Sequence, residues 1–361
     1  MDTQMNPMEH TEPRTMMGES EVVWHDVRQA PFSLHGLYEP ETTPFFHRLP
    51  LDVAEATSEG VNRLSRESAG GRVRFSTNSP YIAIRATFLE VDRCRDLTFI
   101  LSAGFDLYID GEFGSRFVKE YRTPYDLVDF YQEILYVDGE VMRSYTINFP
   151  VHSVVKTLEV GLKPGAQIAE ARPYRDIKPV LFYGSSIVHG TAASRPGNIY
   201  PAIISRELNV DFRNIGFSSM AKGEPVLARW MATLPMSVFV CDYDHNAPSL
   251  KHLEDTHYAL YETIREKNPD VPYIMVTRPD YWTFPREQEY IRKRHDLIMT
   301  SYLKARATGD QNVYFVDGMS FNVAPHQYEM SADGLHPNDA GFIRMADSIG
   351  TFVRHVLEKG T

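Results

Sequence analysis

After Pro173 the sequence alternates short apolar runs with longer amphipathic segments, and this alternation constrains the fold more than any other feature of the chain. The apolar runs have the length of buried strands, while the longer segments carry apolar residues at helical spacing. Strands that alternate with helices form a parallel sheet with helices on both faces. The predicted pairs are Val180 to Tyr183 with Tyr200 to Leu208, Val238 to Cys241 with Leu250 to Glu266, and Tyr273 to Thr277 with Arg286 to Ala305.

A last helix is predicted from Asp339 to Glu358, because its apolar residues fall on one stripe. We expect this stripe to pack on the sheet and to hold the turn that precedes the helix in place. The stripe consists of Phe342, Met345, Ala346, Ile349, Phe352, Val353 and Val356.

The front of the chain has a different pattern. From Val22 to about Ala171 the chain consists of short segments separated by Gly, Pro, Asn and Asp. In several of these segments apolar and polar residues alternate with period two, which is typical of a β-sandwich or jelly roll. With 361 residues, the chain is long enough for two buried cores. We predict a flexible arm at 1–20, a jelly-roll-like β-sandwich domain at 21–173 and an α/β domain at 174–361. Predicted strands include 72–76, 81–87, 97–101 and 157–162.

A serine stands where the first strand of the α/β half ends, in the run Tyr183-Gly184-Ser185-Ser186. The carboxyl ends of parallel strands are where open α/β sheets bind ligands. Far along the chain, Asp333 and His336 share one Asp-x-x-His turn and could supply a base and the carboxylate that orients it. The alternative is that Ser186 is a helix N-cap and that Asp333 begins an ordinary turn.

Two further segments follow the next two predicted strands: Asn214 to Ser219, and Cys241 to Asn246. In this order, the serine, the glycine-type loop, the asparagine and the Asp-x-x-His turn resemble the SGNH/GDSL hydrolase superfamily. The resemblance covers roughly Pro179 to Leu357 and implies a flavodoxin-like domain with esterase activity. Upstream, Gly104-Phe105-Asp106-Leu107-Tyr108 resembles the Gly-x-Asp-Leu-Tyr signature of a β-rich domain that precedes the hydrolase domain in one branch of that superfamily.

The resemblance also implies an oxyanion hole made of the Asn246 side-chain amide and the backbone N–H groups of Ser186 and Ser219. Relatives usually carry a glycine at the position of Ser219. Serine keeps the N–H donor, but it adopts a positive φ reluctantly, so the substitution matters if the loop needs that conformation. Asn246 could instead be a plain turn residue that follows a strand.

Other polar residues near these segments are candidates for substrate contacts. His189 would face the mouth of the site if a helix begins at Ser186, or it could be a partly exposed helix histidine. Arg278 and Trp282 follow another strand at the same sheet edge, where an aromatic wall would suit a sugar ring. Asp244 and His245, with Asp242, could suggest a metal, but no matching His/Asp spacing completes a shell. We therefore predict no metal and no cofactor.

Composition limits the partners of the chain. A net charge of −11 and the lack of a basic run argue against nucleic acid. No apolar segment approaches 18 residues, which argues against a membrane span. The first twenty residues are polar and do not resemble a secretion signal. We therefore expect a cytoplasmic protein. The arm could dock on a neighbouring subunit of a homo-oligomer.

Three functions remain open at this stage. The first is a serine-dependent ester hydrolase that removes a small acyl group, with acetylated oligosaccharides as the leading substrate class. The second is an acyltransferase that uses the same Ser-His-Asp site. The third is a glycan-binding protein without activity, a hypothesis motivated by Ser219.

Overall fold

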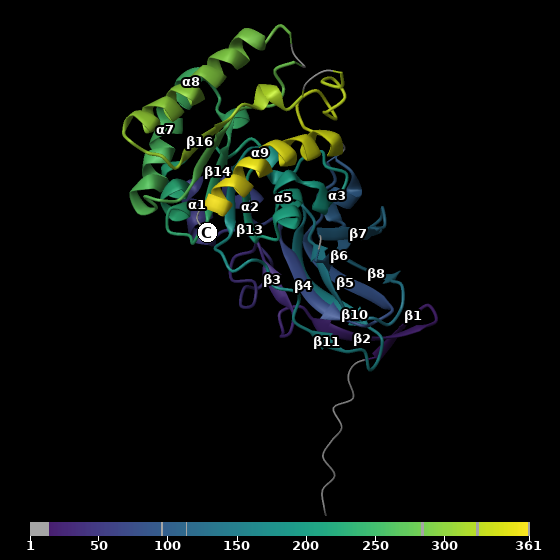
Figure 1. Cartoon of the computed structure of the whole chain (residues 1–361). Coiled ribbons are helices and arrows are strands. Elements are labelled where there is room, and N and C mark those ends of the chain that lie inside the picture. Colours follow the sequence, from purple (N-terminus) through teal and green to yellow (C-terminus); the bar gives the residue numbers. More distant parts are fainter. Residues whose placement is uncertain (1–13, 95–96, 113, 283–284, 323–324, 360–361) are drawn as a thin grey trace, which may run out of the picture.

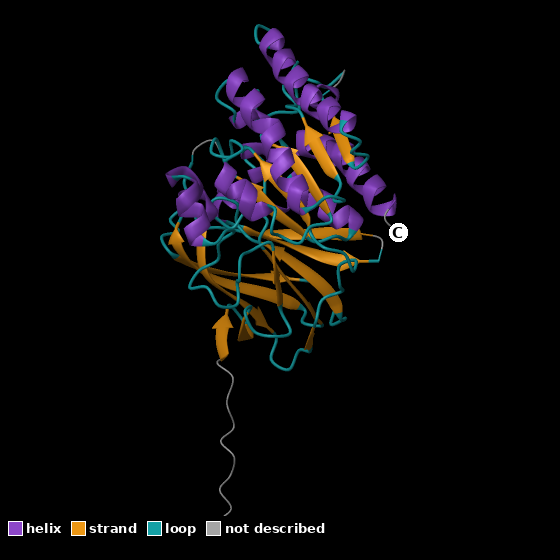
Figure 2. Cartoon of the chain, turned by 90° about the vertical axis from the view of Figure 1, so that its left-hand side faces the viewer, coloured by secondary structure: helices purple, strands orange, loops and turns teal. Residues whose placement is uncertain are grey.

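The computed structural model describes residues 14–94, 97–112, 114–282, 285–322 and 325–359. A β-rich half and an α/β half lie directly against each other (Figures 1 and 2). In Figure 1 the β-rich half runs from purple to blue, and the α/β half continues from teal to yellow. No helix within the described residues is long and apolar enough to cross a bilayer.

The β-rich half is a sandwich of two antiparallel sheets. The first sheet has the order β1-β2-β10-β5-β8. Its strands are β1 (Arg14–Met17), β2 (Ser20–Asp26), β10 (Val154–Leu162), β5 (Tyr81–Glu90) and β8 (Phe130–Tyr136). The second sheet has the order β11-β4-β9-β6-β7, with β3 also paired to β4. Its strands are β3 (Ser33–His35), β4 (Arg72–Thr77), β6 (Phe105–Gly111), β7 (Gly114–Tyr121), β9 (Arg143–Asn148) and β11 (Ile168–Ala169).

The core of this half fills the space between the sheets. Val73 and Ile147 from one sheet share a buried cluster with Ile84 and Val160 from the other. Alternate residues of strands such as β4, β5, β9 and β10 therefore face inward, as the period-two pattern predicted. The jelly-roll connection order stays a prediction.

Two details of this half differ from the sequence prediction. Residues 14–17 of the expected flexible arm form β1, which pairs with β2, while residues 1–13 lie outside the described residues. The predicted strand at 97–101 is wrong, because this segment leads into the short helix α3 (Phe99–Ala103). The side chain of Thr98 accepts a hydrogen bond from the Leu101 N–H at 3.1 Å and so begins the helix.

The α/β half contains one parallel sheet with the order β13-β12-β14-β15-β16, as predicted for a flavodoxin-like domain. The strands are β12 (Val180–Gly184), β13 (Phe212–Gly216), β14 (Val238–Asp242), β15 (Tyr273–Val276) and β16 (Val313–Val316). The chain first adds β13 on one side of β12 and then adds β14 on the other. The carboxyl end of β12 therefore lies at the switch point where such sheets bind ligands.

Helices cover both faces of this sheet. Val180 and Phe182 face α5 and α9, whereas Leu181 and Tyr183 face α6, α7 and α8. Every predicted stripe residue of the last helix is buried except Phe352, which is partly buried. The elements are α4 (Ser186–His189), α5 (Tyr200–Leu208), α6 (Pro225–Met231), α7 (Leu250–Lys267), α8 (Gln288–Ala307), α9 (Asp339–Lys359), and the 3-10 turns η1 (Pro196–Asn198), η2 (Asp244–Asn246) and η3 (Gly318–Ser320).

The two halves share buried structure at their boundary. Helices α1 (Leu51–Thr57) and α2 (Glu59–Ser65) of the β-rich half contribute apolar side chains to the core beneath α6. Arg48, which is buried, donates to the backbone oxygens of Asn214 at 3.1 Å and Gly216 at 2.7 Å in β13. A buried guanidinium bound to carbonyl groups of the other half fixes the relative position of the two sheet systems.

Candidate active site

Ser186 is the first residue of α4, directly after β12. The N-cap is Ser185, whose side chain accepts from the Ile187 N–H at 3.2 Å, so the alternative in which Ser186 only caps the helix is wrong. The turn is tight, because a Cβ on Gly184 would lie 2.1 Å from the Asp242 carbonyl oxygen. Only glycine allows the strand to pass this close to β14 before it presents Ser186.

The hydroxyl of Ser186 lies 2.9 Å from Nε2 of His336, and Nδ1 of His336 lies 2.7 Å from Oδ2 of Asp333. The other oxygen of Asp333 accepts the backbone N–H groups of Leu335 at 2.9 Å and His336 at 2.7 Å. Partial burial raises the pKa of the Asp333 carboxyl, but hydrogen bonds from His336 and Leu335 outweigh burial and leave this pKa below its ordinary value. An ionised Asp333 fixes the proton of His336 on Nδ1, so Nε2 is free to accept the serine proton.

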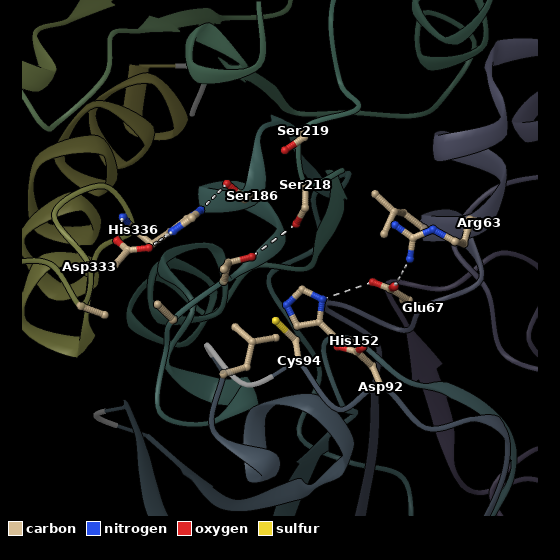
Figure 3. Close-up of a pocket in the computed structure, with 15 residues that line it drawn as sticks. Arg63, Glu67, Asp92, Cys94, His152, Ser186, Ser218, Ser219, Asp333 and His336 are labelled. Carbon is tan, nitrogen blue, oxygen red and sulfur yellow. Dashed lines mark hydrogen bonds and ion pairs between the residues drawn. The ribbon is translucent and has the colours of Figure 1, made fainter. Parts of the chain in front are cut away.

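Ser186 and His336 open into a cavity of about 510 Å³ to which both halves of the chain contribute. Figure 3 shows Ser186, His336 and Asp333 on one side and Arg63, Glu67 and His152 on the opposite side, with Ser218 and Ser219 between them. The lining residues of the β-rich half are Arg63, Leu64, Glu67, Asp92, Cys94, Leu97 and His152, and those of the α/β half are Ser186, Thr191, Ala192, Ser218, Ser219, Ala332, Asp333 and His336.

Ser219 lines the same cavity as Ser186. Its φ is +62°, in the left-handed region that favours glycine. The loop therefore does require the conformation that serine adopts reluctantly, and this chain pays for it with backbone strain of roughly 1 kcal/mol.

Asn246 lies in η2 after β14, is mostly buried, and donates its side-chain amide to the carbonyl oxygen of Phe217 at 2.8 Å. This bond ties the end of β14 to the loop that carries Ser218 and Ser219. A primary amide has two N–H groups, so one remains for another acceptor. Asn246 itself is not among the residues that line the cavity.

The remaining predicted substrate contacts at the strand ends are not among the residues that line the cavity. The Asp244 carboxylate accepts the Nε–H of Arg294 at 2.6 Å, and both side chains are buried. Arg278 donates to Asp280 at 2.6 Å, and His245 lies 3.6 Å from the same carboxylate. The Asp244–Arg294 pair joins the end of β14 to α8, and the contact of His245 with Asp280 joins the loops after β14 and β15. Trp282 donates instead to the carbonyl oxygen of Met319 at 3.1 Å.

The prediction that His189 faces the mouth is wrong, because its side chain is fully buried. Nδ1 lies 3.0 Å from Oγ of Ser218 and also accepts the Ser218 backbone N–H at 3.4 Å. Nε2 of His189 lies 3.0 Å from Oε2 of Glu67, and Nδ1 of His152 lies 3.3 Å from the same oxygen. Both contacts have angles outside ideal hydrogen-bond geometry. Sequence reasoning missed Glu67 and His152, since only packing between the two halves brings them to His189.

Ser218, His189 and Glu67 form a second serine-histidine-carboxylate series beside the cavity. Burial, together with Arg48 and His152, lowers the pKa of His189 to about 3. An imidazole with such a low pKa is a weak base at neutral pH and does not activate a serine as His336 can. The series therefore orients Ser218 rather than deprotonating it.

The same region contains three side chains that could together hold a metal ion, Glu67, His152 and His189, whose ligand atoms lie within 4.8 Å of one another. The Arg48 guanidinium lies 3.4 Å from Nε2 of His189. A divalent ion bound there would stand beside a buried positive charge in a medium of low polarity. The donor set fits a metal by geometry, but the neighbouring charge opposes it.

Two family models match the chain. The GDSL-like lipase/acylhydrolase family matches residues 177–354, and the family described as the N-terminus of SGNH-hydrolase-type esterases, called GxDLY, matches residues 22–168. No curated protein sequence shows a significant match.

Solved structures share the arrangement of both halves. A Bacteroides ovatus protein provisionally classified as a GDSL-like lipase is 27% identical over 93% of this chain and 98% of its own, with a TM-score of 0.83. The salicylyl-acyltransferase SsfX3 from a tetracycline biosynthetic pathway is 19% identical, covers 91% of this chain and 95% of its own, and has a TM-score of 0.72. The acetyl xylan esterase Est2A from the rumen bacterium Butyrivibrio proteoclasticus is 11% identical over 93% of this chain and 99% of its own, with a TM-score of 0.59.

Proposed function

Because the chain belongs to the GDSL-like lipase/acylhydrolase family and is a carboxylic ester hydrolase, we propose that Ser186 is its nucleophile, His336 its general base and Asp333 the residue that orients His336. The observation that carries this proposal is the continuous series of contacts from the Ser186 hydroxyl through both nitrogens of His336 to Asp333. The hydroxyl needs such a base, since serine is a weak nucleophile at its own pKa.

In the proposed reaction the Ser186 oxygen attacks the ester carbonyl while Nε2 of His336 takes the serine proton. His336 then gives that proton to the departing alcohol, which leaves an acyl group on Ser186. A water molecule, deprotonated by His336, releases the acid and restores the serine. Asp333 stays ionised throughout and stabilises the imidazolium that forms in each half of the cycle.

We assign the oxyanion donors to the backbone N–H groups of Ser186 and Ser219 and to the Asn246 amide. The shared cavity of Ser186 and Ser219 supports the first two. The bond from Asn246 to Phe217 supports the third, because it holds the amide against the loop of Ser219. Each donor aimed at the developing negative charge is worth roughly 3 kcal/mol of transition-state stabilisation.

The proposed substrate is an O-acetylated oligosaccharide, encountered in the cytoplasm. Charged and polar side chains line the wall opposite Ser186, including Arg63, Asp92 and Glu67, and such groups suit the hydroxyls of an oligosaccharide. An acetyl xylan esterase with the same fold also supports this substrate class. Acetate release from a panel of acetylated oligosaccharides by the wild type and Ser186→Ala tests it. We expect Ser186-dependent release, whereas activity on simple aryl acetates alone would contradict the carbohydrate assignment.

Acyl transfer to an alcohol remains a second candidate, since one structure with the same fold is an acyltransferase. The two reactions share the acyl-enzyme and differ in whether water or an alcohol attacks it. Product analysis with an aryl acetate in the presence of added sugars separates them. We expect free acetate to dominate, and acetylated sugar as the main product would favour the transferase.

A further inference from the structure

Asp106, in the Gly-Phe-Asp-Leu-Tyr motif of the β-rich half, is fully buried and binds the α/β half directly. Its Oδ2 accepts the backbone N–H of Gly197 at 2.8 Å and the guanidinium of Arg195 at 3.0 Å. Its Oδ1 accepts the side-chain amide of Asn148 at 2.7 Å. The Gly197 N–H and the Arg195 guanidinium can only donate, so a carboxylate oxygen suits them both, and the Asn148 amide adds a third hydrogen bond.

Tyr108 of the same motif completes the contact. Its hydroxyl binds Arg195, whose guanidinium also lies 3.8 Å from the centre of the Phe117 ring. A Cβ on Gly197 would lie 2.6 Å from the Tyr108 hydroxyl and 2.8 Å from the Asp106 carboxylate. The glycine therefore permits a close approach between the motif and the segment that contains η1.

The segment held by this motif connects the two parts of the proposed catalytic site. It begins with Thr191 and Ala192, which line the cavity directly after α4, the helix of Ser186. At Ser194 it meets the start of α9: the carboxylate of Asp339 accepts the Ser194 N–H at 2.8 Å and the Ser194 hydroxyl at 2.6 Å. Asp339 stands three residues after His336, so the segment joins the nucleophile's helix to the turn of the base.

We propose that the Asp106 carboxylate is a positioning residue for catalysis, which sets the His336 turn relative to Ser186 through the segment 191–197 and the Ser194–Asp339 contact. The catalytic part of this inference rests on the proposed function of Ser186 and His336. Asp106 touches neither the cavity nor the reacting atoms, and it acts by holding one end of a segment whose other contact is Asp339. The motif thereby couples the β-rich half to the chemistry of the other half.

The test compares Asp106→Asn with Asp110→Asn. Asp110 lies on the same strand and also pairs with a buried arginine, Arg74 at 3.1 Å, but its carboxylate contacts stay within the β-rich half. In Asp106→Asn the negative charge opposite Arg195 is lost, and the new amide N–H faces either the donors of Gly197 and Arg195 or Asn148, whose own amide must flip to accept it. In Asp110→Asn the Ser115 hydroxyl, 2.7 Å away, can rotate to accept.

The first readout is the NMR resonance of the proton on Nδ1 of His336, which does not depend on turnover. The resonance is assigned because it disappears in His336→Gln. The second is kcat and KM for an aryl acetate. We expect Asp106→Asn to broaden or shift the resonance and to lower kcat by roughly 10- to 100-fold with little change in KM, as loss of alignment requires. In Asp110→Asn we expect the His336 resonance, kcat and KM to stay at their wild-type values. If Asp106→Asn fails to fold, Ser194→Ala and Tyr108→Phe are measured in the same way, with the same direction of effect.

Unchanged resonance and kcat in Asp106→Asn, or equal effects in Asp106→Asn and Asp110→Asn, would overturn the positioning role. If the fallback variants are used, unchanged readouts in both overturn it as well. A disturbed resonance in Asp106→Asn alone, combined with full activity of Ser186→Ala, would leave the structural coupling intact and would refute the proposed function instead.

Discussion

Nε2 of His189, in the α/β half, lies 3.0 Å from Oε2 of Glu67, in the β-rich half, and both side chains are buried. Burial lowers the pKa of His189 to about 3, helped by Arg48 and His152. Burial raises the pKa of Glu67, but contacts with His152 and His189 outweigh it and lower this pKa to about 2. The folded protein therefore holds a neutral imidazole and an ionised carboxylate at the boundary of its two halves.

This pair predicts that stability falls on acidification. Below pH 6.5 the unfolded chain protonates His189, whereas the folded chain does so only near pH 3. Below about pH 4.5 the unfolded chain also protonates Glu67, which the folded chain resists until about pH 2, so this loss adds to the first. Because His245 and His257 have pKa values of about 4 and act in the same direction, His189→Gln removes only its own share. The free energy of unfolding, measured with urea at several pH values, should therefore fall less steeply with acidification in His189→Gln than in the wild type. Between about pH 5.5 and 4 we expect the two slopes against pH to differ by roughly 1.4 kcal/mol per pH unit. An unchanged slope would contradict a buried neutral His189.

Ser219 predicts a stabilising substitution. Its φ of +62° is strained for serine and free for glycine, so Ser219→Gly should raise the free energy of unfolding by up to about 1 kcal/mol while keeping the backbone N–H. The urea midpoint at neutral pH measures the gain in stability. The value of kcat for an aryl acetate shows whether the backbone N–H still serves catalysis. A lower midpoint would contradict this prediction, because the greater unfolded-state entropy of glycine would then outweigh the relieved strain.

Asn246 should matter to the transition state rather than to substrate binding. Asn246→Ala removes the proposed amide donor, and we expect kcat to fall by roughly 10²- to 10³-fold with KM little changed. The bond to Phe217 is lost as well, so the urea midpoint is measured alongside. A rate within about threefold of the wild type, in a folded variant, would exclude Asn246 from the oxyanion hole.

Removal of divalent ions should leave activity unchanged. The positive charge of Arg48, 3.4 Å from His189, opposes a metal at Glu67, His152 and His189, and the proposed serine mechanism uses none. Dialysis against a strong chelator, followed by the aryl acetate assay with and without added zinc, checks this. Loss of activity on chelation and its return with zinc would contradict both arguments.

The alternation of strands and helices in most of the α/β half followed from the sequence, because strand and helix periodicities are local signals, whereas α6 and β16 were not predicted. The Asp333 and His336 contact was also accessible, since a three-residue spacing keeps both side chains on one turn. The environment of His189 was not accessible. Its partner Glu67 lies 122 positions earlier in another domain, and no local pattern marks a contact made by packing. The helix at Phe99–Ala103 was missed because a short apolar run does not distinguish strand from helix.

The central claim is tested most directly by comparing two serines of one cavity, Ser186 and Ser218, in the hydrolysis of an aryl acetate. Ser186→Ala should lose roughly 10⁴-fold or more in kcat, because Ser186 alone contacts His336, and a denatured wild-type sample quenched during turnover should carry the acetyl group on Ser186. Ser218→Ala, whose serine contacts the poorly basic His189, should stay within about tenfold of the wild type. Equal rates for the wild type and Ser186→Ala, or an acetyl group found on Ser218 instead, would contradict the account.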